Sequence, residues 1–175
     1  MTWNPYDSLP PAEAFSLTSS DLREGEKLAT PQVSGVFDAG GDDVSPQLSW
    51  SGFPEETQSF VLTMYDPDAP TVSGFWHWAV ANIPAEVTEL PASAGSESGS
   101  DLPRAALQLR NDAGIARYIG AAPPEGLGRH RYIFSVHALS TESVAIDKEA
   151  TPALLMFSIL ESTLGRAFLT GWYER

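Results

Sequence analysis

The sequence Asp66-Pro67-Asp68-Ala69-Pro70 separates two strand-like segments, and the rest of the chain is organised around it. Residues 59–65, which precede it, are rich in β-branched and aromatic side chains and place an apolar residue at every second position, as one face of a strand requires. Each proline removes a backbone N–H and fixes φ, so a sheet ladder cannot continue through this segment. We therefore expect a rigid corner at a strand end, which holds the carboxylates of Asp66 and Asp68.

A second strand is predicted immediately after the corner, over residues 75–83. Strict alternation puts His77 on the same face as Phe75 and Ala79, and puts Trp76 and Trp78 on the other face. Both faces are apolar, so we expect this strand to be central and buried. By itself, a buried histidine beside two corner aspartates is also typical of a structural arrangement, with an Asx turn and a hydrogen-bonded core histidine.

A third strand is predicted over residues 130–139, where apolar and polar side chains alternate. This alternation places His130 and Tyr132 on one face and Arg131 on the other. We therefore expect Arg131 to point away from any ligand that the other two contact. Shorter strands are predicted over residues 15–17, 32–36, 46–50 and 106–110.

The segments outside these strands also carry predictions. Residues 1–14 are polar and contain three prolines, which favours an extended arm lying on a single domain that spans 1–175. Residues 152–171 have apolar side chains at helical spacing and a capping Thr151, which predicts a C-terminal helix with a kink or a break at Gly165. Residues 38–45 hold three aspartates, but they lack the spacing of a calcium loop and indicate a solvated turn.

The composition excludes several classes of protein. The 175 residues carry a formal net charge of −13, which disfavours binding to nucleic acid or to an anionic membrane surface. The absence of cysteine excludes disulfides, a thiol nucleophile and thiolate metal ligands. No apolar run approaches the roughly 18 residues of a membrane span, and the first residues do not have the pattern of a signal peptide. These features predict a cytoplasmic protein without stable membrane insertion.

Five short motifs resemble, in order, those of the phosphatidylethanolamine-binding protein family, and most closely its bacterial, Raf-kinase-inhibitor-like branch. The resemblance extends from about Phe15 to the C-terminus, and it rests on Ser45-Pro46-Gln47-Leu48-Ser49-Trp50, Tyr65-Asp66-Pro67-Asp68-Ala69-Pro70, Phe75-Trp76-His77-Trp78, Tyr118-Ile119-Gly120-Ala121-Ala122-Pro123-Pro124 and Gly128-Arg129-His130-Arg131-Tyr132. It implies a mainly β fold, an antiparallel β-sandwich with a few peripheral helices that include the C-terminal one. It also implies one ligand-binding pocket, formed by Asp66, Asp68, His77, Tyr118, Ala122, Pro123, His130 and Tyr132.

The resemblance further implies a binding module that is not an enzyme and that uses no cofactor and no metal. Its expected ligand is a phosphate, a phosphoethanolamine-like head group or a phosphorylated group, and its expected protein partners are a protein kinase or a serine protease. A tendency to form homodimers is also implied. Two alternatives stay open: a kinase or protease inhibitor that uses its surface and keeps only a vestigial pocket, and a metal-dependent hydrolase built on the two aspartates and two histidines.

The chemistry of the predicted pocket depends on its histidines. Two carboxylates repel an anion, but a carboxylate paired with an imidazolium gives a nearly neutral unit that presents an N–H to a ligand. We expect Asp66 and Asp68 to pair with His77 and His130 in this way. Anion binding should then strengthen as the pH falls through about 6.5, the reference pKa of histidine.

Overall fold

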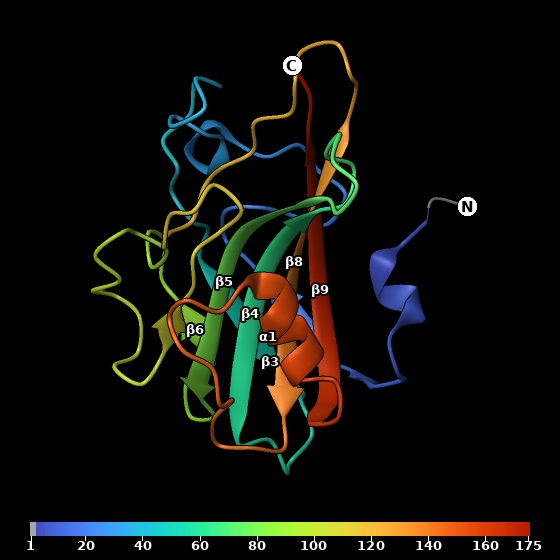
Figure 1. Cartoon of the computed structure of the whole chain (residues 1–175), viewed down its shortest axis with the longest axis vertical. Helices are drawn as coiled ribbons and strands as arrows, with labels where there is room; N and C mark the ends of the chain where they lie inside the picture. Colours follow the sequence, from blue (N-terminus) through green and yellow to red (C-terminus); the bar gives the residue numbers. More distant parts are fainter. Residues whose placement is uncertain (1–2) are drawn as a thin grey trace.

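The strands of the chain form two antiparallel sheets, apart from one short parallel pairing at an edge (Figure 1). The computed structural model describes residues 3–175. The larger sheet has the order β1-β9-β8-β4-β5-β7, and the smaller has the order β2-β3-β6. The strands are β1 (Glu13–Ala14), β2 (Ser16–Thr18), β3 (Leu48–Ser51), β4 (Ser59–Asp66), β5 (Phe75–Pro84), β6 (Glu89–Leu90), β7 (Leu107–Gln108), β8 (His130–Leu139) and β9 (Thr163–Tyr173).

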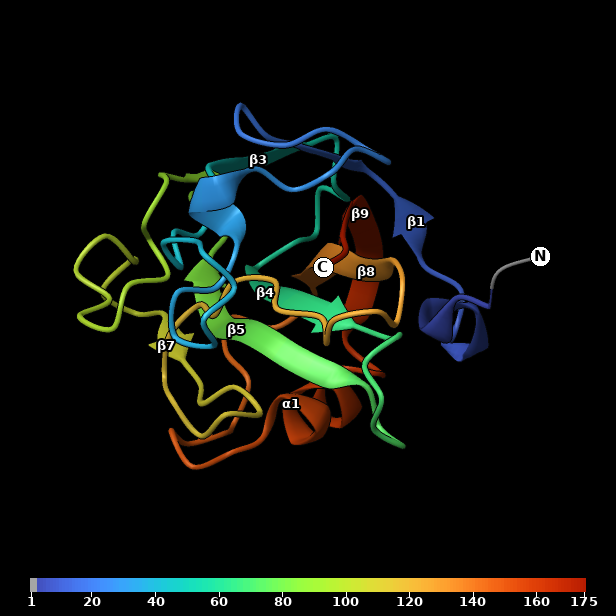
Figure 2. The same ribbon diagram turned by 90° about the horizontal axis from the view of Figure 1, so that it is seen from above.

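Helical structure is short and peripheral. One α-helix, α1, spans Pro152–Ser158, and two 3-10 helices span Pro5–Ser8 and Thr30–Gln32. Seen from above, the small sheet and α1 lie on opposite faces of the large sheet (Figure 2). The chain therefore has three layers, with β4, β5 and β8 in the middle one. Within residues 3–175, no helix is long and apolar enough to cross a membrane.

Two hydrophobic cores result from this layering, and they explain why β4 is buried along its whole length. Phe60, Leu62 and Met64 pack between the two sheets, whereas Val61 packs between the large sheet and α1. Successive side chains of a strand point to opposite faces, so a strand in the middle layer needs apolar residues at both sets of positions. The β-sandwich with peripheral helices predicted from the sequence is confirmed.

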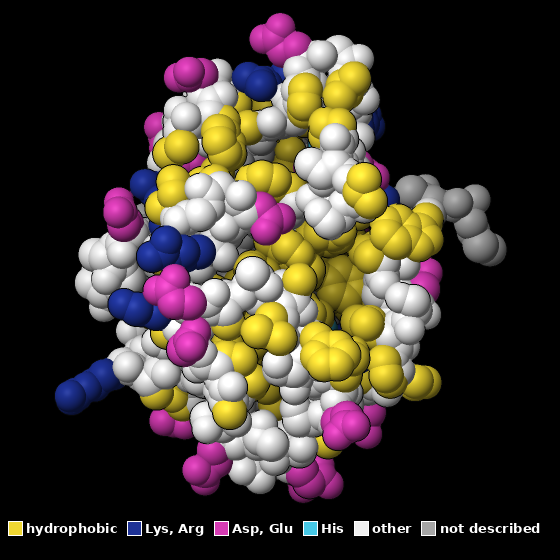
Figure 3. Space-filling model, viewed as in Figure 1, with side chains coloured by type: hydrophobic (Ala, Val, Ile, Leu, Met, Phe, Trp, Pro, Cys, Tyr) yellow, Lys and Arg dark blue, Asp and Glu magenta, His cyan; other side chains and the backbone are white. Residues whose placement is uncertain are grey.

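The side of the molecule that carries α1 exposes part of its hydrophobic surface. Figure 3 shows hydrophobic side chains across this face, with acidic side chains mostly towards its margin. Leu154 and Phe157 of α1 are about half and three-quarters exposed, at 50% and 72%. The short helix thus covers its core with Leu155 and Ile159, and it presents its other side to solvent.

The predicted helix over residues 152–171 is wrong beyond Ser158. The helix begins as expected, since the side chain of Thr151 accepts a hydrogen bond from the Leu154 N–H and Pro152 occupies the first turn. After a turn, however, the chain continues as β9, which pairs with β8 over ten residue pairs. This stretch contains two glycines and several aromatic and β-branched residues, and such residues favour a strand when a partner edge is available.

Two further sequence predictions need correction. Residues 32–36, predicted as a strand, form the end of a 3-10 helix and a turn, with only a single bridge from Val33 to Ala121. Residues 38–45 form a turn, but it is not fully solvated, because Asp43 is buried. The N-terminal arm, of which residues 1–2 lie outside the described residues, includes a 3-10 helix and the short strand β1 in addition to extended segments.

Candidate ligand-binding site

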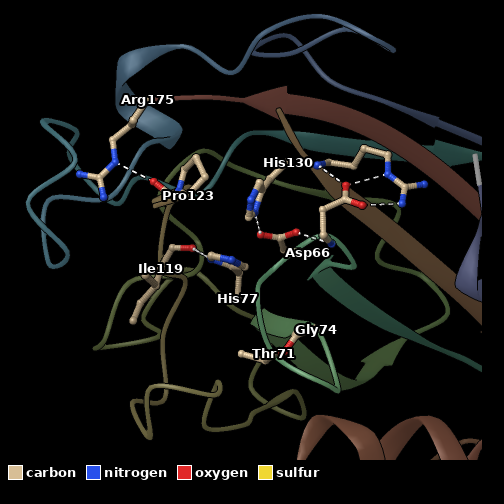
Figure 4. Close-up of polar contacts among 10 residues, drawn as sticks. Asp66, Thr71, Gly74, His77, Ile119, Pro123, His130 and Arg175 are labelled. Atoms are coloured by element: carbon tan, nitrogen blue, oxygen red, sulfur yellow. Dashed lines mark hydrogen bonds and ion pairs between the residues drawn. The ribbon is translucent and has the colours of Figure 1, made fainter. Parts of the chain in front are cut away.

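A cavity of about 160 Å³ opens at the end of the large sheet where β4 ends and where β5 and β8 begin. It lies near the C-terminus of the chain in Figure 1. Side chains from four segments far apart in the sequence meet there, and Figure 4 shows their polar contacts. The cavity is lined by Phe37, Asp66, Ala69, Pro70, Thr71, Phe75, His77, Ala122, Pro123, Pro124, His130 and Tyr132.

Asp66 and His130 form a buried pair in the wall of this cavity. Nδ1 of His130 lies 2.9 Å from Oδ2 of Asp66, and both side chains are only 3% exposed. The other carboxylate oxygen, Oδ1, accepts the backbone N–H of Asp68 at 2.8 Å. Burial raises the pKa of the Asp66 carboxyl, although the hydrogen bond from His130 opposes this shift. One of the predicted pairs between an aspartate and a histidine is therefore present.

His77 has a different partner from the one expected. Its Nδ1 lies 2.9 Å from the carbonyl oxygen of Ile119, so it pairs with the backbone and not with either aspartate (Figure 4). The buried ring packs edge-on against Tyr132, with 5.2 Å between ring centroids. Burial lowers the pKa of His77 to about 4, which outweighs the contrary effects of the backbone hydrogen bond and of nearby Asp43. The expected charge switch therefore does not apply to His77.

The orientation of His77 depends on a β-bulge. Met64 pairs with Trp78 and Tyr65 pairs with Trp76, so His77 is an extra residue on β5 with no partner on β4. As a result His77 contacts Tyr132 on the face that Trp78 also occupies, not on the face of Ala79 that strict alternation predicts. Bulges often turn side chains towards functional sites in this manner.

Asp68 does not line the cavity, because its carboxylate binds Arg131. Oδ1 accepts Nη2 of Arg131 at 2.7 Å, and Oδ2 accepts both Nε and the backbone N–H of the same residue at 2.8 and 2.9 Å. Burial tends to raise the pKa of Asp68, but the hydrogen bonds from Arg131 hold it below its usual value. Arg131 points away from the cavity, as predicted, and its contact ties the corner to β8.

The other predicted site residues are divided between the cavity and the core beneath it. Ala122, Pro123 and Tyr132 line the cavity. The hydroxyl of Tyr132 is buried beside the backbone N–H of Ala122, and its own hydrogen has no acceptor among residues 3–175. Tyr118 instead lies behind the cavity, where its hydroxyl donates to the carbonyl of Gln32 at 2.8 Å. The structure therefore brings together Asp66, His77, Ala122, Pro123, His130 and Tyr132, and it leaves Asp68 and Tyr118 in supporting positions.

Sequence reasoning missed the contribution of the turn at residues 35–43. Phe37, which lies in this turn, forms part of the cavity wall. Asp43 is buried at the base of the turn, and its carboxylate accepts the backbone N–H groups of Gly35, Val36 and Gly120, each at 2.8 Å. This carboxylate thus joins the turn to the loop that carries Ala122. The glycines before and within the aspartate cluster, Gly35, Gly40 and Gly41, were the available signal, since glycine permits close approach of two backbones.

The site has the hydrogen-bonding groups of a small polar pocket but not those of a metal centre. Among the described residues, no group of three or more histidine, aspartate or glutamate side chains is arranged to hold a metal ion. The two carboxylates that the hydrolase alternative requires are already hydrogen-bonded, Asp66 to His130 and Asp68 to Arg131. Among the residues that line the cavity, Nε2 of His77 and of His130 takes part in no hydrogen bond with the described chain, and the Tyr132 hydroxyl has a hydrogen without an acceptor.

Comparison with known proteins identifies the fold family. The family model described as phosphatidylethanolamine-binding protein matches residues 18–174. The chain belongs to this family. YbcL of Escherichia coli K12 is 47% identical over 163 residues, which cover 93% of this chain and 89% of YbcL. YbhB of the same organism is 45% identical over 160 residues, which cover 91% of this chain and all of YbhB.

Solved structures of the family have the same architecture. The crystal structure of E. coli YbcL matches with a TM-score of 0.89 and 46% identity, over 92% of this chain and 98% of that one. The homologue CT736 of Chlamydia trachomatis matches with a TM-score of 0.77 and 28% identity, over 94% and 99% of the two chains. The family membership inferred from the five motifs is therefore confirmed.

Proposed function

We propose that this family member is a non-catalytic binding protein whose cavity holds a phosphate-bearing small molecule. Two features of the cavity wall carry the proposal: the buried His130–Asp66 pair, and a buried Tyr132 hydroxyl whose hydrogen has no acceptor among the described residues. A buried polar group without a partner costs about 1 to 3 kcal/mol, and a ligand oxygen that accepts the Tyr132 hydrogen removes that cost. When the His130 imidazole is protonated, its Nε2 donates as well, and Asp66 balances the charge.

The size of the cavity supports a small anionic group. Pockets that enclose a whole drug-sized ligand usually have volumes of about 300 to 1,000 Å³, whereas this one has about 160 Å³. A tetrahedral oxyanion fits in the space, and the rest of a larger ligand has to lie outside it. The rim includes an exposed apolar side chain, since Phe37 lines the cavity and is 40% exposed. A phosphate group on a short organic stem, such as phosphoethanolamine, fits this combination.

Calorimetric titration tests this proposal. The wild type is titrated with O-phosphorylethanolamine, and we expect His130→Ala to bind at least about 30-fold more weakly, since removal of one partner of a buried charged pair costs about 2 kcal/mol or more. Tyr132→Phe, which removes only the hydroxyl, should lose up to about tenfold.

A matched control uses the exposed ion pair between Arg110 and Glu149, which are 3.8 Å apart on the surface. Arg110→Gln should bind like the wild type. Wild-type affinity in His130→Ala would show that the cavity is not the binding site, and absence of binding in the wild type would remove the proposed function.

A further inference from the structure

The hydrogen-bond partner of His77 fixes which of its ring nitrogens carries the hydrogen. A backbone carbonyl only accepts hydrogen bonds, so Nδ1 of His77, 2.9 Å from the Ile119 carbonyl oxygen, is the donor. In a neutral imidazole the other nitrogen, Nε2, is then a hydrogen-bond acceptor. His77 lines the cavity, and its Nε2 takes part in no hydrogen bond among the described residues. The cavity therefore contains a fixed acceptor.

The surroundings of His77 keep the ring neutral. The charged and titratable groups that face it are Asp43, from the turn at 35–43, and the pocket residues Asp66, His130 and Tyr132. Within the described chain, no carboxylate oxygen lies within 4 Å of either ring nitrogen of His77, in contrast to His130. Burial, the largest influence, lowers the pKa of His77 to about 4, and neighbouring His130 acts in the same direction. Above about pH 5, Nε2 of His77 stays an acceptor.

A fixed acceptor imposes a requirement on an oxyanion ligand. A fully deprotonated oxyanion offers only lone pairs, which repel the lone pair of Nε2. A singly protonated phosphate offers one P–OH hydrogen to Nε2 of His77 and keeps its remaining oxygens for donors such as Tyr132. Phosphomonoesters have a second pKa of about 6, so this form is populated near neutral pH. A phosphodiester and a sulfate ester carry no such hydrogen.

We propose that the pocket selects phosphomonoesters in their singly protonated form, through a hydrogen bond from the ligand P–OH to Nε2 of His77. This inference rests on the proposed function, and it narrows the ligand class. It implies tighter binding of the phosphomonoester of a small alcohol than of the phosphodiester that occurs in a phospholipid head group.

Three ethanolamine derivatives test the selection, because they differ in little besides this hydrogen. O-phosphorylethanolamine is a phosphomonoester, 2-aminoethyl hydrogen sulfate is its sulfate ester counterpart, and glycerophosphorylethanolamine is a phosphodiester. Near pH 5 each carries one negative charge on its oxyanion. We expect calorimetry at pH 5 to give at least about tenfold tighter binding for the phosphomonoester than for the other two, since a hydrogen bond to a charged group contributes about 1.5 to 3 kcal/mol.

The pH dependence separates protonation of the ligand from changes in the charge of the protein. A change in the charge of the protein alters the affinity of all three compounds, whereas only the phosphomonoester loses its own hydrogen. We expect the ratio of phosphomonoester to sulfate ester affinity to fall by at least about tenfold from pH 5 to pH 8, towards a limit near 100-fold set by a pKa of about 6. A ratio that stays near one at every pH overturns the selection but leaves anion binding in place. Failure of all three compounds to bind overturns both proposals.

A variant and a spectroscopic signal link the effect to His77. His77→Phe keeps an aromatic ring against Tyr132 but has no acceptor, so the preference for the phosphomonoester at pH 5 should shrink to about one. ¹⁵N spectra of the wild-type imidazoles provide a second reading that needs no variant. We expect the Nδ1–H tautomer of His77 at pH 6 and a shift of its Nε2 signal with O-phosphorylethanolamine but not with the sulfate ester. An Nε2–H tautomer at pH 6 overturns the proposal.

Discussion

Nδ1 of His130 meets the carboxylate of Asp66, whereas Nδ1 of His77 meets the carbonyl of Ile119. The two rings line one cavity, yet their different partners give them different hydrogen-bonding roles. The ring at position 130 has a carboxylate partner, whereas the carbonyl together with burial leaves a neutral ring at position 77 that accepts a hydrogen bond. The sequence places both histidines at the site, but it does not show which one contacts a carboxylate.

Asp66→Asn should separate binding from stability. Burial raises the pKa of Asp66, so the folded protein disfavours the charged carboxylate, and a neutral amide of the same shape relieves this cost. We expect affinity for O-phosphorylethanolamine to fall at least about tenfold, with no decrease in the free energy of unfolding at pH 7. Calorimetry and urea denaturation measure the two quantities. A loss of stability greater than about 2 kcal/mol would show that the Asp66–His130 pair mainly stabilises the fold.

At the scale of elements, an ion pair between Asp68 and Arg131, here called the clamp, ties the proline-bounded corner after β4 to the start of β8. Both oxygens of Asp68 bind Arg131, and these side chains are only 29% and 24% exposed. The clamp brings the end of β4 to the start of β8, which is the geometry that the Asp66–His130 pair requires. Asp68 thus supports the cavity from outside.

Asp68→Asn should therefore lower the free energy of unfolding by about 1 to 2 kcal/mol, because it weakens hydrogen bonds to a charged group. Arg110→Gln, which breaks a more exposed pair, should change stability by less than about 0.5 kcal/mol. Urea denaturation of both variants measures the difference. Equal effects of the two substitutions would mean that the clamp is an ordinary surface pair.

Gly120→Ala should damage the loop that carries Ala122. A Cβ at this position would overlap the backbone of Gln32 and Val33, which cannot move away easily. The N–H of Gly120 also donates to Asp43 at 2.8 Å, so a displaced loop loses that bond. We expect a loss of roughly 2 kcal/mol or more in stability, in the range of overpacked sites, and weaker ligand binding.

Gly126→Ala is the control for this substitution. Its Cβ would meet nothing within 4 Å, and only its φ of +77° carries a cost, of about 1 kcal/mol. Denaturation and calorimetry of both variants compare the effects. A Gly120 variant as stable as the Gly126 variant would show that the loop has more freedom than the packing indicates.

Sequence reasoning predicted well the elements in which apolar residues alternate clearly or in which prolines end a strand. The three central strands follow from residues 59–65, 75–83 and 130–139, and the corner follows from its two prolines. The bulge at His77 and the strand β9 could not be predicted, because both depend on the register and edge of a neighbouring strand. Asp43 was missed for a similar reason, since its partner Gly120 lies 77 positions away.

At the scale of the whole molecule, all three histidines are buried, and two of them, His77 and His137, lie in surroundings that disfavour a charge. Burial lowers the pKa of His77 to about 4 and that of His137 to about 3, with Arg166 adding to the second effect. Both folded-state values lie below the unfolded value of 6.5, so the unfolded chain binds more protons as the pH falls. Stability is therefore fully present above about pH 6.5 and is lost as the pH falls towards 4 and 3.

We expect the free energy of unfolding to fall below pH 6 with a slope that approaches about 2.7 kcal/mol per pH unit, the limit for two protons. His137→Gln should reduce this slope by up to about half. Urea denaturation at pH 7, 6 and 5 measures it. An unchanged slope in the variant would mean that other groups cause the acid sensitivity.

The most direct test of the binding pocket is an NMR titration of ¹⁵N-labelled protein with O-phosphorylethanolamine at pH 6, followed through the ring nitrogens of its three histidines. His137 lies outside the cavity, with Nε2 hydrogen-bonded to Ser135 at 3.1 Å, and serves as an internal control. We expect saturable shifts at His77, His130 and the Ala122 amide, with no shift at His137. Saturable shifts elsewhere, with His77 and His130 unchanged, would contradict the assignment of this cavity as the ligand site.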